Sequence, residues 1–386
     1  MIKREARDDT AAELFGLTKE IADAELRPKV AEAERHGYFP RAEFRTLGQA
    51  GLLTLPYQEE YGGGGQPYET YLQVVEELAT AWLAVGLGVS VHTLSCFPIA
   101  TAGTTEQRDR WLPGMLGGDQ LGAYCLSEPG SGSDAAALAT RAVADGDEFM
   151  IDGVKAWTTH GGHADFYTVF ARTSGDPAGP DRSRGISCFH VPASVPCVSA
   201  APPEHKMGMR SSATAQMRFE SVRVPAVQLV GEAEHGFRIA LAALDAGRLG
   251  IAACATGVAQ AALDCAVGYA AQRTQFGRPV IEFQGLQFML ADMATAVAAS
   301  RALYLSAARR KDAGEPYGQQ AAMAKLLAAD TAMRVTTDAV QVLGGYGYVE
   351  DFPAERLMRE AKVLQIVEGT NQIQRLVIGR QLMPTS

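Results

Sequence analysis

The spacing of apolar residues changes character twice along the chain. From about residue 10 to 118, Ala- and Glu-rich stretches follow a helical pattern that glycine and proline interrupt. From about 120 to 230 the pattern favours strands, because Phe166–Phe170 and Ile186–Val191 are short apolar runs bounded by turn residues. From about 236 onward the helical pattern returns. The chain is therefore predicted to form helices, then a β unit, then helices again.

The last helical region has the features of a bundle. Ile251–Ala271 is rich in small residues, which allow two helices to approach closely. Five apolar residues at spacings of three and four place a stripe on one helix face: Phe283, Leu286, Leu290, Met293 and Val297. We therefore predict an α+β fold with an N-terminal helical domain at 1–118, a middle β-barrel or sandwich at 119–232, and a C-terminal four-helix bundle at 233–386.

The composition is that of an ordinary globular protein. Of the 386 residues, 47% are hydrophobic and 20% charged, which excludes disordered and collagen-like chains. The net charge is −9 without a long basic run, so nucleic-acid binding is not expected. The apolar segment Leu78–Val91 is shorter than the roughly 20 residues of a membrane-spanning helix, so we predict a buried helix and no membrane span. Met1–Glu5 is charged and no apolar run follows it, so we expect no signal peptide and a cytoplasmic protein.

The cysteines and glycines point to no metal site and no NAD site. The six cysteines form no CxxC pair and lack zinc-ligand spacing, so we predict small, buried, reduced side chains. Two glycine clusters, Gly62–Gly65 and Gly344–Gly347, do not fit the G-x-G-x-x-G dinucleotide fingerprint. The first is predicted to be a mobile loop. The second ends a helical stretch, where glycine serves as a C-cap or lets the backbone approach a ligand.

Several long motifs in a fixed order carry a family resemblance. Cys125–Asp134 reads CLSEPGSGSD, Gln341–Glu360 begins QVLGGYG, and Glu368–Arg375 reads EGTNQIQR. Together with the intervening segments 204–212, 244–248 and 273–277, they resemble the acyl-CoA dehydrogenases, nearest the short-chain and medium-chain branches. The resemblance spans nearly the whole chain and implies the same helix–β–helix plan.

The resemblance implies that FAD lies between the β domain and the bundle. Tyr124–Ser133 would follow the flavin and its ribityl chain, and Trp157 would sit against one face of the ring. Arg273 would contact the pyrophosphate and adenine portion from a neighbouring subunit, which implies a homotetramer with shared FAD sites. The implied FAD contacts are Tyr124, Leu126, Ser127, Ser133, Trp157, Thr159, Arg273, Phe276, Gln284, Gln341, Gly344, Gly345, Thr370 and Gln372.

The resemblance also implies contacts to an acyl-CoA thioester. Asp245 and Arg248 match the pair that holds the pantetheine and phosphate region, while Ser133 and Gly369 match further substrate contacts. From the residues alone, Asp245 and Arg248 are an ion pair at helical i,i+3 spacing, and the two interpretations can coexist. Ala81–Cys96 is a candidate lining of the acyl pocket.

Glu368 is the implied catalytic residue. In the family, FAD-dependent dehydrogenation yields the 2-enoyl-CoA: a base removes the α-proton while the β-hydrogen passes as hydride to flavin N5. Some branches carry the base instead at the position of Gly247, which has no side chain to serve as one. Two features depart from the family pattern. Val367 stands where nearby branches have an aromatic residue, and the histidines at 160 and 163, predicted to be loop residues, are unexpected.

Several alternatives remain open at the level of sequence. The implied electron acceptor is an electron-transfer flavoprotein. The substrate could instead be an acyl thioester on a carrier protein, as in biosynthetic relatives, or the electrons could pass to O2. A different class of function is a flavin-binding or scaffold protein without turnover. Chain length and branching of the acyl group are not determined by these motifs.

Overall fold

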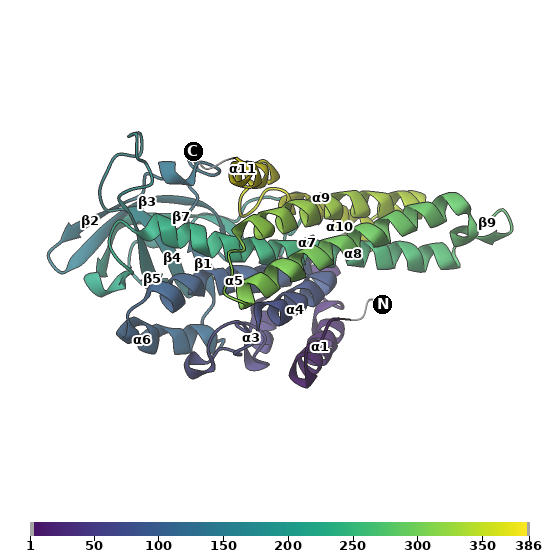
Figure 1. Cartoon of the computed structure of the whole chain (residues 1–386), viewed down its shortest axis with the longest axis horizontal. Coiled ribbons are helices and arrows are strands. Elements are labelled where there is room, and N and C mark those ends of the chain that lie inside the picture. Colours follow the sequence, from purple (N-terminus) through teal and green to yellow (C-terminus); the bar gives the residue numbers. More distant parts are fainter. Residues whose placement is uncertain (1–3, 384–386) are drawn as a thin grey trace.

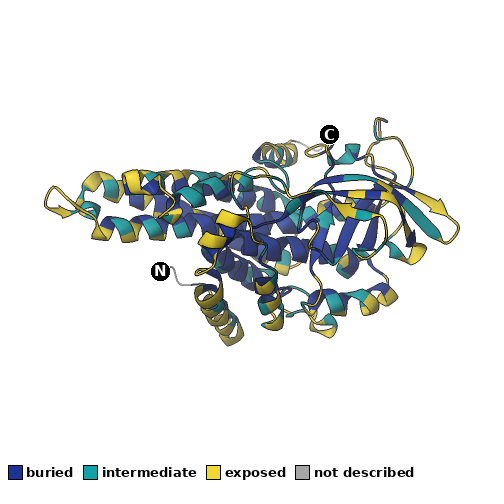
Figure 2. Cartoon of the chain, turned by 180° about the vertical axis from the view of Figure 1, so that it is seen from behind, coloured by how far each residue is buried: buried dark blue, intermediate teal, exposed yellow. Residues whose placement is uncertain are grey.

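The computed structural model of the chain describes residues 4–383. A β domain and a long helical bundle lie at opposite ends of an elongated molecule (Figure 1). The N-terminal helices pack along one side, between the two ends. The first three residues of the charged segment Met1–Glu5 lie outside the described part of the chain. Burial is continuous from the centre of the bundle into the strands of the β domain, whereas the outer helices and the far hairpin carry most of the exposed residues (Figure 2).

The N-terminal domain is helical, as predicted. Local capping explains several of its boundaries. The Asp8 carboxylate accepts a hydrogen bond from the Ala11 amide at 2.8 Å, and α2 ends at Gly37, whose φ of 72° favours glycine. Thr104 and Gln107 form a capping box at the start of α6. The helices are α1 (Asp9–Ile21), α2 (Val30–His36), α3 (Arg41–Gln49), α4 (Tyr68–Ala81), α5 (Leu83–Ala102) and α6 (Thr105–Leu116).

The segment Leu78–Val91 is largely buried and helical, as predicted, but it forms parts of two helices instead of one, because the chain breaks at Trp82. The backbone of Trp82 is extended, with φ −156° and ψ 105°, so α4 ends before it and α5 begins after it. The buried indole Nε1 donates to Ser211 Oγ at 3.0 Å, a tertiary partner that no local pattern reveals. Helix α5 is nevertheless long and apolar enough to cross a membrane by length and composition alone, as are α7 and α8. In α5, 89% of the most apolar window is buried inside the protein.

In the described part of the chain, eight strands of the middle domain form one sheet. Its order is β6-β7-β3-β2-β4-β5-β8, and β1 pairs with β4 in parallel. A single residue pair, Arg141 with Arg172, joins the β2 and β4 halves. Met217 and Phe219 of one half share a core with Phe189 of the other, which agrees with the predicted β domain. The strands are β1 (Gly122–Cys125), β2 (Arg141–Asp145), β3 (Glu148–Thr159), β4 (Phe166–Arg172), β5 (Ile186–Pro192), β6 (Val198–Ala200), β7 (Thr214–Pro225) and β8 (Leu229–Val230).

The C-terminal domain is the predicted helical bundle. Helices α7 (Gly236–Gln272), α8 (Gln284–Asp312), α9 (Gly318–Leu343) and α10 (Pro353–Leu364) run back and forth along its length, and α11 (Asn371–Leu382) lies across them (Figure 1). A hairpin of β9 (Thr274–Gln275) and β10 (Arg278–Pro279) joins α7 to α8 at the far end. Of the predicted apolar stripe, Leu290, Met293 and Val297 are buried, whereas Phe283 and Leu286 are half-buried.

Small residues on α7 allow it to pack closely against α4. A Cβ on Gly257 would lie 2.4 Å from the Glu76 carbonyl oxygen, so only glycine fits at this crossing. Helix α7 also packs against α5, α8 and α9. It is therefore the central element that connects the N-terminal helices, the bundle and the β domain, and its first turns lead into the candidate site.

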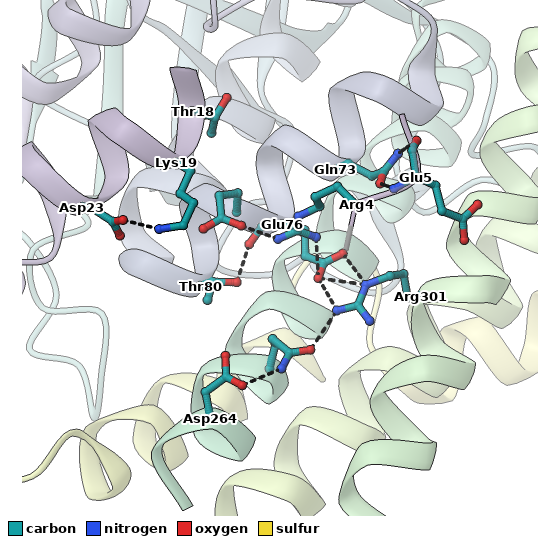
Figure 3. Close-up of polar contacts among 12 residues, drawn as sticks. Arg4, Glu5, Thr18, Lys19, Asp23, Gln73, Glu76, Thr80, Asp264 and Arg301 are labelled. Atoms are coloured by element: carbon teal, nitrogen blue, oxygen red, sulfur yellow. Dashed lines mark hydrogen bonds and ion pairs between the residues drawn. The ribbon is translucent and has the colours of Figure 1, made fainter. Parts of the chain in front are cut away.

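A buried ion network joins the N-terminal segment to the bundle (Figure 3). The Glu76 carboxylate of α4 is fully buried and accepts from Arg301 of α8, with Nη2 to Oε1 at 2.6 Å. Arg4 Nη1 lies 2.7 Å from the same oxygen, and the Tyr304 hydroxyl donates to the other one. Burial would raise the pKa of Glu76, but the two arginines outweigh it and lower the pKa.

The cysteine and glycine predictions are partly confirmed. Cys96, Cys125, Cys188 and Cys254 are buried thiols, but Cys265 is half-buried and Cys197 is exposed, with a positive φ of 69° in the segment before β6. In the Gly62–Gly65 cluster, a Cβ on residue 63 would lie 2.3 Å from the Tyr57 carbonyl oxygen and one on residue 64 would lie 2.8 Å from Leu55 Cδ2. The cluster therefore packs closely against the preceding segment. Gly344 caps α9 with φ 61°, as predicted.

Candidate active site

Glu368 lies in the short turn between α10 and α11, in a backbone conformation that is unusual for its residue type. Its φ is 52° and that of Gly369 is 89°. A positive φ is uncommon for residues other than glycine and persists only when the surroundings hold it. Thr370 then begins α11 as its N-cap, with Oγ1 accepting from the Ile373 amide at 3.3 Å. The turn thus combines a strained backbone with a tightly capped helix.

The carboxylate of Glu368 is buried and unpaired. Although the residue as a whole is half-buried, both of its oxygens are shielded from solvent, and neither has a hydrogen-bond partner within residues 4–383. Burial raises the pKa of Glu368 to about 7, and the nearby charges of Lys325 and Arg248 counteract this rise. A buried carboxylate without a partner is costly, and such groups gather at functional sites.

Gly247 of α7 forms one wall beside this carboxylate. A Cβ at this position would lie 2.1 Å from Glu368 Oε2, so no side chain fits there while the glutamate keeps its place. The close approach of Glu368 therefore gives a steric reason for glycine at position 247. This is the position at which other branches of the family that the sequence resembles carry a base. Val367, the preceding residue in the turn, packs partly buried against the bundle core.

A second buried glutamate with a raised pKa provides a useful contrast. Burial raises the pKa of Glu360 in α10 to about 7 as well, and Arg356 opposes this. Its two oxygens, however, accept from Arg356 Nη1 at 3.2 and 3.1 Å. Glu360 is therefore satisfied inside the protein, whereas the Glu368 carboxylate is free to act on another molecule. The hydrogen bonds from Arg356, and not the pKa values, distinguish Glu360 from Glu368.

The predicted pair on α7 lies next to Glu368. Arg248 Nη1 donates to Asp245 Oδ1, so the i,i+3 ion pair is confirmed. Arg248 is buried, and its Nε has no partner among the described residues. Burial raises the pKa of Asp245, and Arg248 opposes the rise. The two residues are about one helical turn apart on α7, and their side chains meet in a direct ion pair next to Gly247.

A cavity of about 240 Å³ opens beside Ala246 and Gly247. The Tyr68 hydroxyl donates to the Ala246 carbonyl oxygen at 3.3 Å and the Tyr57 hydroxyl to the Thr93 carbonyl oxygen at 2.5 Å, which fixes both rings. Part of the lining comes from within the segment 81–96, as the sequence suggested. The α5 residues that line the cavity are Ser90, Thr93, Leu94, Phe97, Ala100 and Thr101.

The β-domain residues of the predicted flavin site lie close together. The Ala156 amide donates to the Ser127 carbonyl oxygen at 2.8 Å, which joins the loop after β1 to β3. The next residue, Trp157, lies at an irregularity in the pairing of β3 with β7 and has a φ of 59°, with 63% of its surface exposed. An exposed indole on a left-handed backbone is a costly arrangement that a flat ligand would justify. Thr159, two residues later, is half-buried.

The other residues of this group surround the same loop. The Tyr124 hydroxyl donates to the Ala240 carbonyl oxygen at 3.2 Å, which connects β1 to the start of α7. Leu126 is buried, whereas Ser133 is exposed at the end of the loop. Between them, Ser131 Oγ is buried and has no partner within the described residues. This loop therefore presents polar groups that a bound molecule could satisfy.

A buried ion pair that sequence reasoning missed holds the loop in place. Lys155 Nζ lies 2.8 Å from Glu128 Oε1 and donates to the Leu126 carbonyl oxygen at 3.2 Å. The Glu128 carboxylate also accepts from the Ala139 and Thr140 amides, at 2.6 and 2.9 Å. Glu128 belongs to the motif at 125–134, so its charge was visible there, but its partner 27 residues away was not.

A second group of predicted residues lies at the other end of the bundle. Arg273 follows the end of α7, its guanidinium 5.9 Å from the centre of the Tyr346 ring, and Phe276 is 95% exposed at the hairpin tip. Because a helix rises about 1.5 Å per residue, Arg273 is about 40 Å from Arg248 along α7. The residues at this far end are Arg273, Phe276, Gln284, Gln341, Gly344 and Gly345, whereas Thr370 and Gln372 lie at the start of α11, next to Glu368.

Of the two histidines after β3, His160 belongs to the protein interior and His163 is exposed. His160 is buried and makes edge contacts with Phe39 and Phe44, and its Nδ1 is 2.9 Å from the Gly122 carbonyl oxygen. His163 stacks on Phe39 at 4.2 Å. Both lie in the turn after β3, as predicted, and their ring contacts with Phe39 and Phe44 help to pack α3 and its preceding loop against the β domain. Within residues 4–383, no group of three or more His, Cys, Asp or Glu side chains is placed to hold a metal ion.

Comparison with known families covers almost the whole chain. The model of the acyl-CoA dehydrogenase N-terminal domain matches residues 8–119, that of the middle domain residues 123–222, and that of the C-terminal domain residues 234–383. The chain is 44% identical over 369 residues to a short-chain specific acyl-CoA dehydrogenase of Bos taurus mitochondria, covering 95% of this chain and 88% of that protein.

Solved structures agree with this match. Butyryl-CoA dehydrogenase from Megasphaera elsdenii superposes with a TM-score of 0.95 at 39% identity, covering 98% of this chain and all of that one. A chain from work on the electron transferring flavoprotein of Acidaminococcus fermentans superposes with a TM-score of 0.96 at 41% identity, covering 100% of both chains. The chain belongs to the acyl-CoA dehydrogenase family.

Proposed function

We propose that this enzyme dehydrogenates a short-chain acyl-CoA to the 2-enoyl-CoA, with FAD as cofactor and Glu368 as the base. The buried, unpaired Glu368 carboxylate beside Gly247 carries the proposal, because it is the group in this site that is free to accept a proton from a bound molecule. Two similar proteins support a short-chain substrate. One is the short-chain specific acyl-CoA dehydrogenase of Bos taurus, and the other is the butyryl-CoA dehydrogenase of Megasphaera elsdenii. The cavity of about 240 Å³ is of a size that suits a short acyl group.

The residues present fit FAD. The exposed, strained Trp157 and the loop at 124–133 lie side by side, and Ser131 Oγ in that loop is buried without a partner. These residues, with Thr159, would hold the flavin and its ribityl chain. When bound, FAD supplies the acceptor for the hydride that leaves the β-carbon of the substrate. The Lys155–Glu128 ion pair keeps the loop in position for this contact.

Glu368 moves the proton. As the α-carbon–hydrogen bond breaks, the carboxylate takes the proton, and the electron pair of that bond forms the α,β double bond while the β-hydrogen leaves with its own electron pair. A pKa raised by burial to about 7 makes the carboxylate a stronger base and leaves about half of it ionised near neutral pH. Below that pKa the group is protonated and cannot act, so the rate is expected to rise with pH through this range.

Asp245 and Arg248 would bind the CoA portion. The guanidinium is buried and fixed by its ion pair, and its Nε is free among the described residues. An arginine fork suits phosphate and amide oxygens better than a lysine does. The pair lies on the same turn of α7 as Gly247, which would place the thioester next to Glu368.

The family resemblance implies a homotetramer in which neighbouring subunits complete each FAD site. Arg273, Phe276 and Gln284 are exposed, and Arg273 is about 40 Å from Arg248 along α7, which supports a contact of these residues with the FAD of another copy. We expect an electron-transfer flavoprotein to accept the electrons. Sedimentation velocity of the FAD-loaded enzyme tests the shared site: a tetramer is expected, and a monodisperse monomer with a full complement of FAD would contradict it.

The substrate proposal is tested by anaerobic titration of the yellow enzyme with butyryl-CoA, then with longer and branched acyl-CoAs. Butyryl-CoA is expected to bleach the flavin band most effectively, because the cavity beside Gly247 is small. Bleaching by a carrier-protein thioester and by no CoA ester would move the substrate to the carrier-bound class. Failure of any thioester to bleach a protein that binds FAD would support a flavin-binding role without turnover.

A further inference from the structure

We propose that Lys325 is a positioning residue for Glu368: it holds the turn at 368–371 in its strained conformation and keeps a positive charge beside the base. This inference rests on the proposed role of Glu368. Lys325 lies in α9, a helix that none of the family motifs marks at this position, and its side chain is fully buried. Among residues 4–383, its ammonium makes no hydrogen bond to the flavin loop or to Asp245 and Arg248.

The ammonium of Lys325 bonds directly to the turn. Nζ donates to the Gly369 carbonyl oxygen and to Asn371 Oδ1, each at 2.9 Å. These acceptors belong to the first and third residues after Glu368. The bonds therefore fix the carbonyl of the residue with φ 89° and the first residue of α11, on the C-terminal side of the base.

Other side chains also form hydrogen bonds that hold the same turn. Gln374 Nε2 donates to the Gly369 carbonyl oxygen at 2.8 Å and to the Glu368 carbonyl oxygen at 3.3 Å. Asn371 Nδ2 and Gln365 Nε2 both donate to Asp330 Oδ1 at 2.7 Å. A left-handed glutamate persists only when its surroundings determine its conformation, and Lys325 is the positively charged member of this set.

The choice of an ammonium is informative, because a neutral amide could satisfy the same two acceptors. Burying a charge is costly, and both groups that Lys325 bonds to are neutral. What the ammonium adds is its charge. The charged groups that act on Lys325 are Glu368, Arg248 and Asp330, and those that act on Glu368 are Lys325 and Arg248. Around Glu368 also lie Tyr68, Tyr71, Tyr124 and Cys254, whose pKa values are raised mainly by burial and to a smaller extent by the charge of Glu368.

The directions of the pKa shifts agree with this role. Burial lowers the pKa of Lys325 to about 8, and Glu368 is the largest influence that raises it. Near neutral pH the lysine is therefore charged and favours the ionised form of Glu368. Removing the charge raises the pH at which the base becomes ionised. Above about pH 8 the lysine itself loses its proton, so its effect disappears there.

The test is the pH profile of flavin reduction in the FAD-loaded Lys325→Met enzyme. Rates with saturating butyryl-CoA are measured by anaerobic stopped flow from about pH 5 to 9. We expect the midpoint of the acid limb to rise by about one pH unit, a typical effect of one opposite charge. The variant is then about tenfold slower than the wild type below both midpoints and approaches it at alkaline pH. A loss by the same factor at every pH, or an unmoved midpoint, would overturn the electrostatic role.

Matched variants keep the outcome interpretable. Lys206 is a partly buried lysine that also donates to a backbone carbonyl, that of Ser212, at 2.7 Å, but its charged neighbours are Glu34 and Glu204. Lys206→Met is expected to leave the midpoint unchanged. Should Lys325→Met fail to fold, Lys325→Gln retains hydrogen-bond donors without the charge, and the same rise is expected. Glu368→Gln separates the two proposals. If this variant still reduces flavin, the base is wrong. If it is inert and the Lys325→Met midpoint is unmoved, only the electrostatic role of Lys325 is overturned.

Discussion

Glu368→Gln is expected to bind FAD like the wild type and to reduce its flavin about 100- to 10,000-fold more slowly, the usual contribution of a positioned general base. The amide has the shape of the carboxylate but cannot accept the α-proton. Since the carboxylate makes no hydrogen bond within the described residues, the substitution removes no internal contact that stabilises the fold. Anaerobic stopped flow with butyryl-CoA measures the effect, and the flavin absorbance of the purified protein measures cofactor content.

Glu360→Gln is the matched control for this variant. Glu360 is also a buried glutamate whose pKa burial raises to about 7, but Arg356 occupies its oxygens. Its replacement is expected to leave the rate of flavin reduction within a few-fold of the wild type. Rapid reduction by Glu368→Gln, or an equal loss in both variants, would show that the base has been assigned to the wrong residue.

The contact between Gly247 and Glu368 permits a second approach to the same carboxylate. The methyl group of Gly247→Ala would lie 2.1 Å from Oε2, so the carboxylate must move. A displacement of about 1 Å in a reacting group commonly costs about 100-fold in rate. Gly268→Ala is the control on the same helix, since nothing lies within 4 Å of its added Cβ and alanine favours the helix.

Glu76→Gln is expected to lower the free energy of unfolding by about 3–5 kcal/mol, the usual cost of removing one partner from a buried ion pair. The amide keeps the volume of the side chain but leaves Arg301 and Arg4 without their shared counter-charge in the interior. The Tyr304 hydroxyl also loses a charged acceptor. Because the pKa of Glu76 is lowered in the folded protein, its contribution is present above the pKa of the unfolded chain and is lost as the pH falls.

The neighbouring residue provides the control for stability. Glu77 forms an ion pair with Arg4 at 2.7 Å, but its side chain is partly exposed. Glu77→Gln is expected to cost no more than about 1 kcal/mol, as is usual for pairs near the surface. Guanidinium denaturation of the FAD-loaded proteins at one fixed concentration compares the two, because ligand binding and assembly both change apparent stability. Equal losses in both variants would mean that the buried network adds nothing beyond a surface pair.

Several features of the chain follow from local sequence. The helix–β–helix plan is readable because apolar spacing changes with secondary structure, and the strands at 166–170 and 186–191 lie where the pattern predicts them. Glu368 could be selected among many acidic residues because it lies in a contiguous motif at 368–375. The Asp245–Arg248 pair is likewise local, since residues three apart share one helix face.

Other features depend on the tertiary structure alone. The break at Trp82 follows from a bond to Ser211, and the wall beside the base from the approach of Gly247 to Glu368. Lys325 reaches the turn at 369–371 from another helix, and Glu76 meets Arg301 across more than half of the chain. Each of these contacts joins residues far apart in sequence. The spacing of apolar residues indicates which face of a helix is apolar, but it does not indicate which side chain of another element packs against that face. For this reason only the packing of α4, α7, α9 and α10 decided how the base is held.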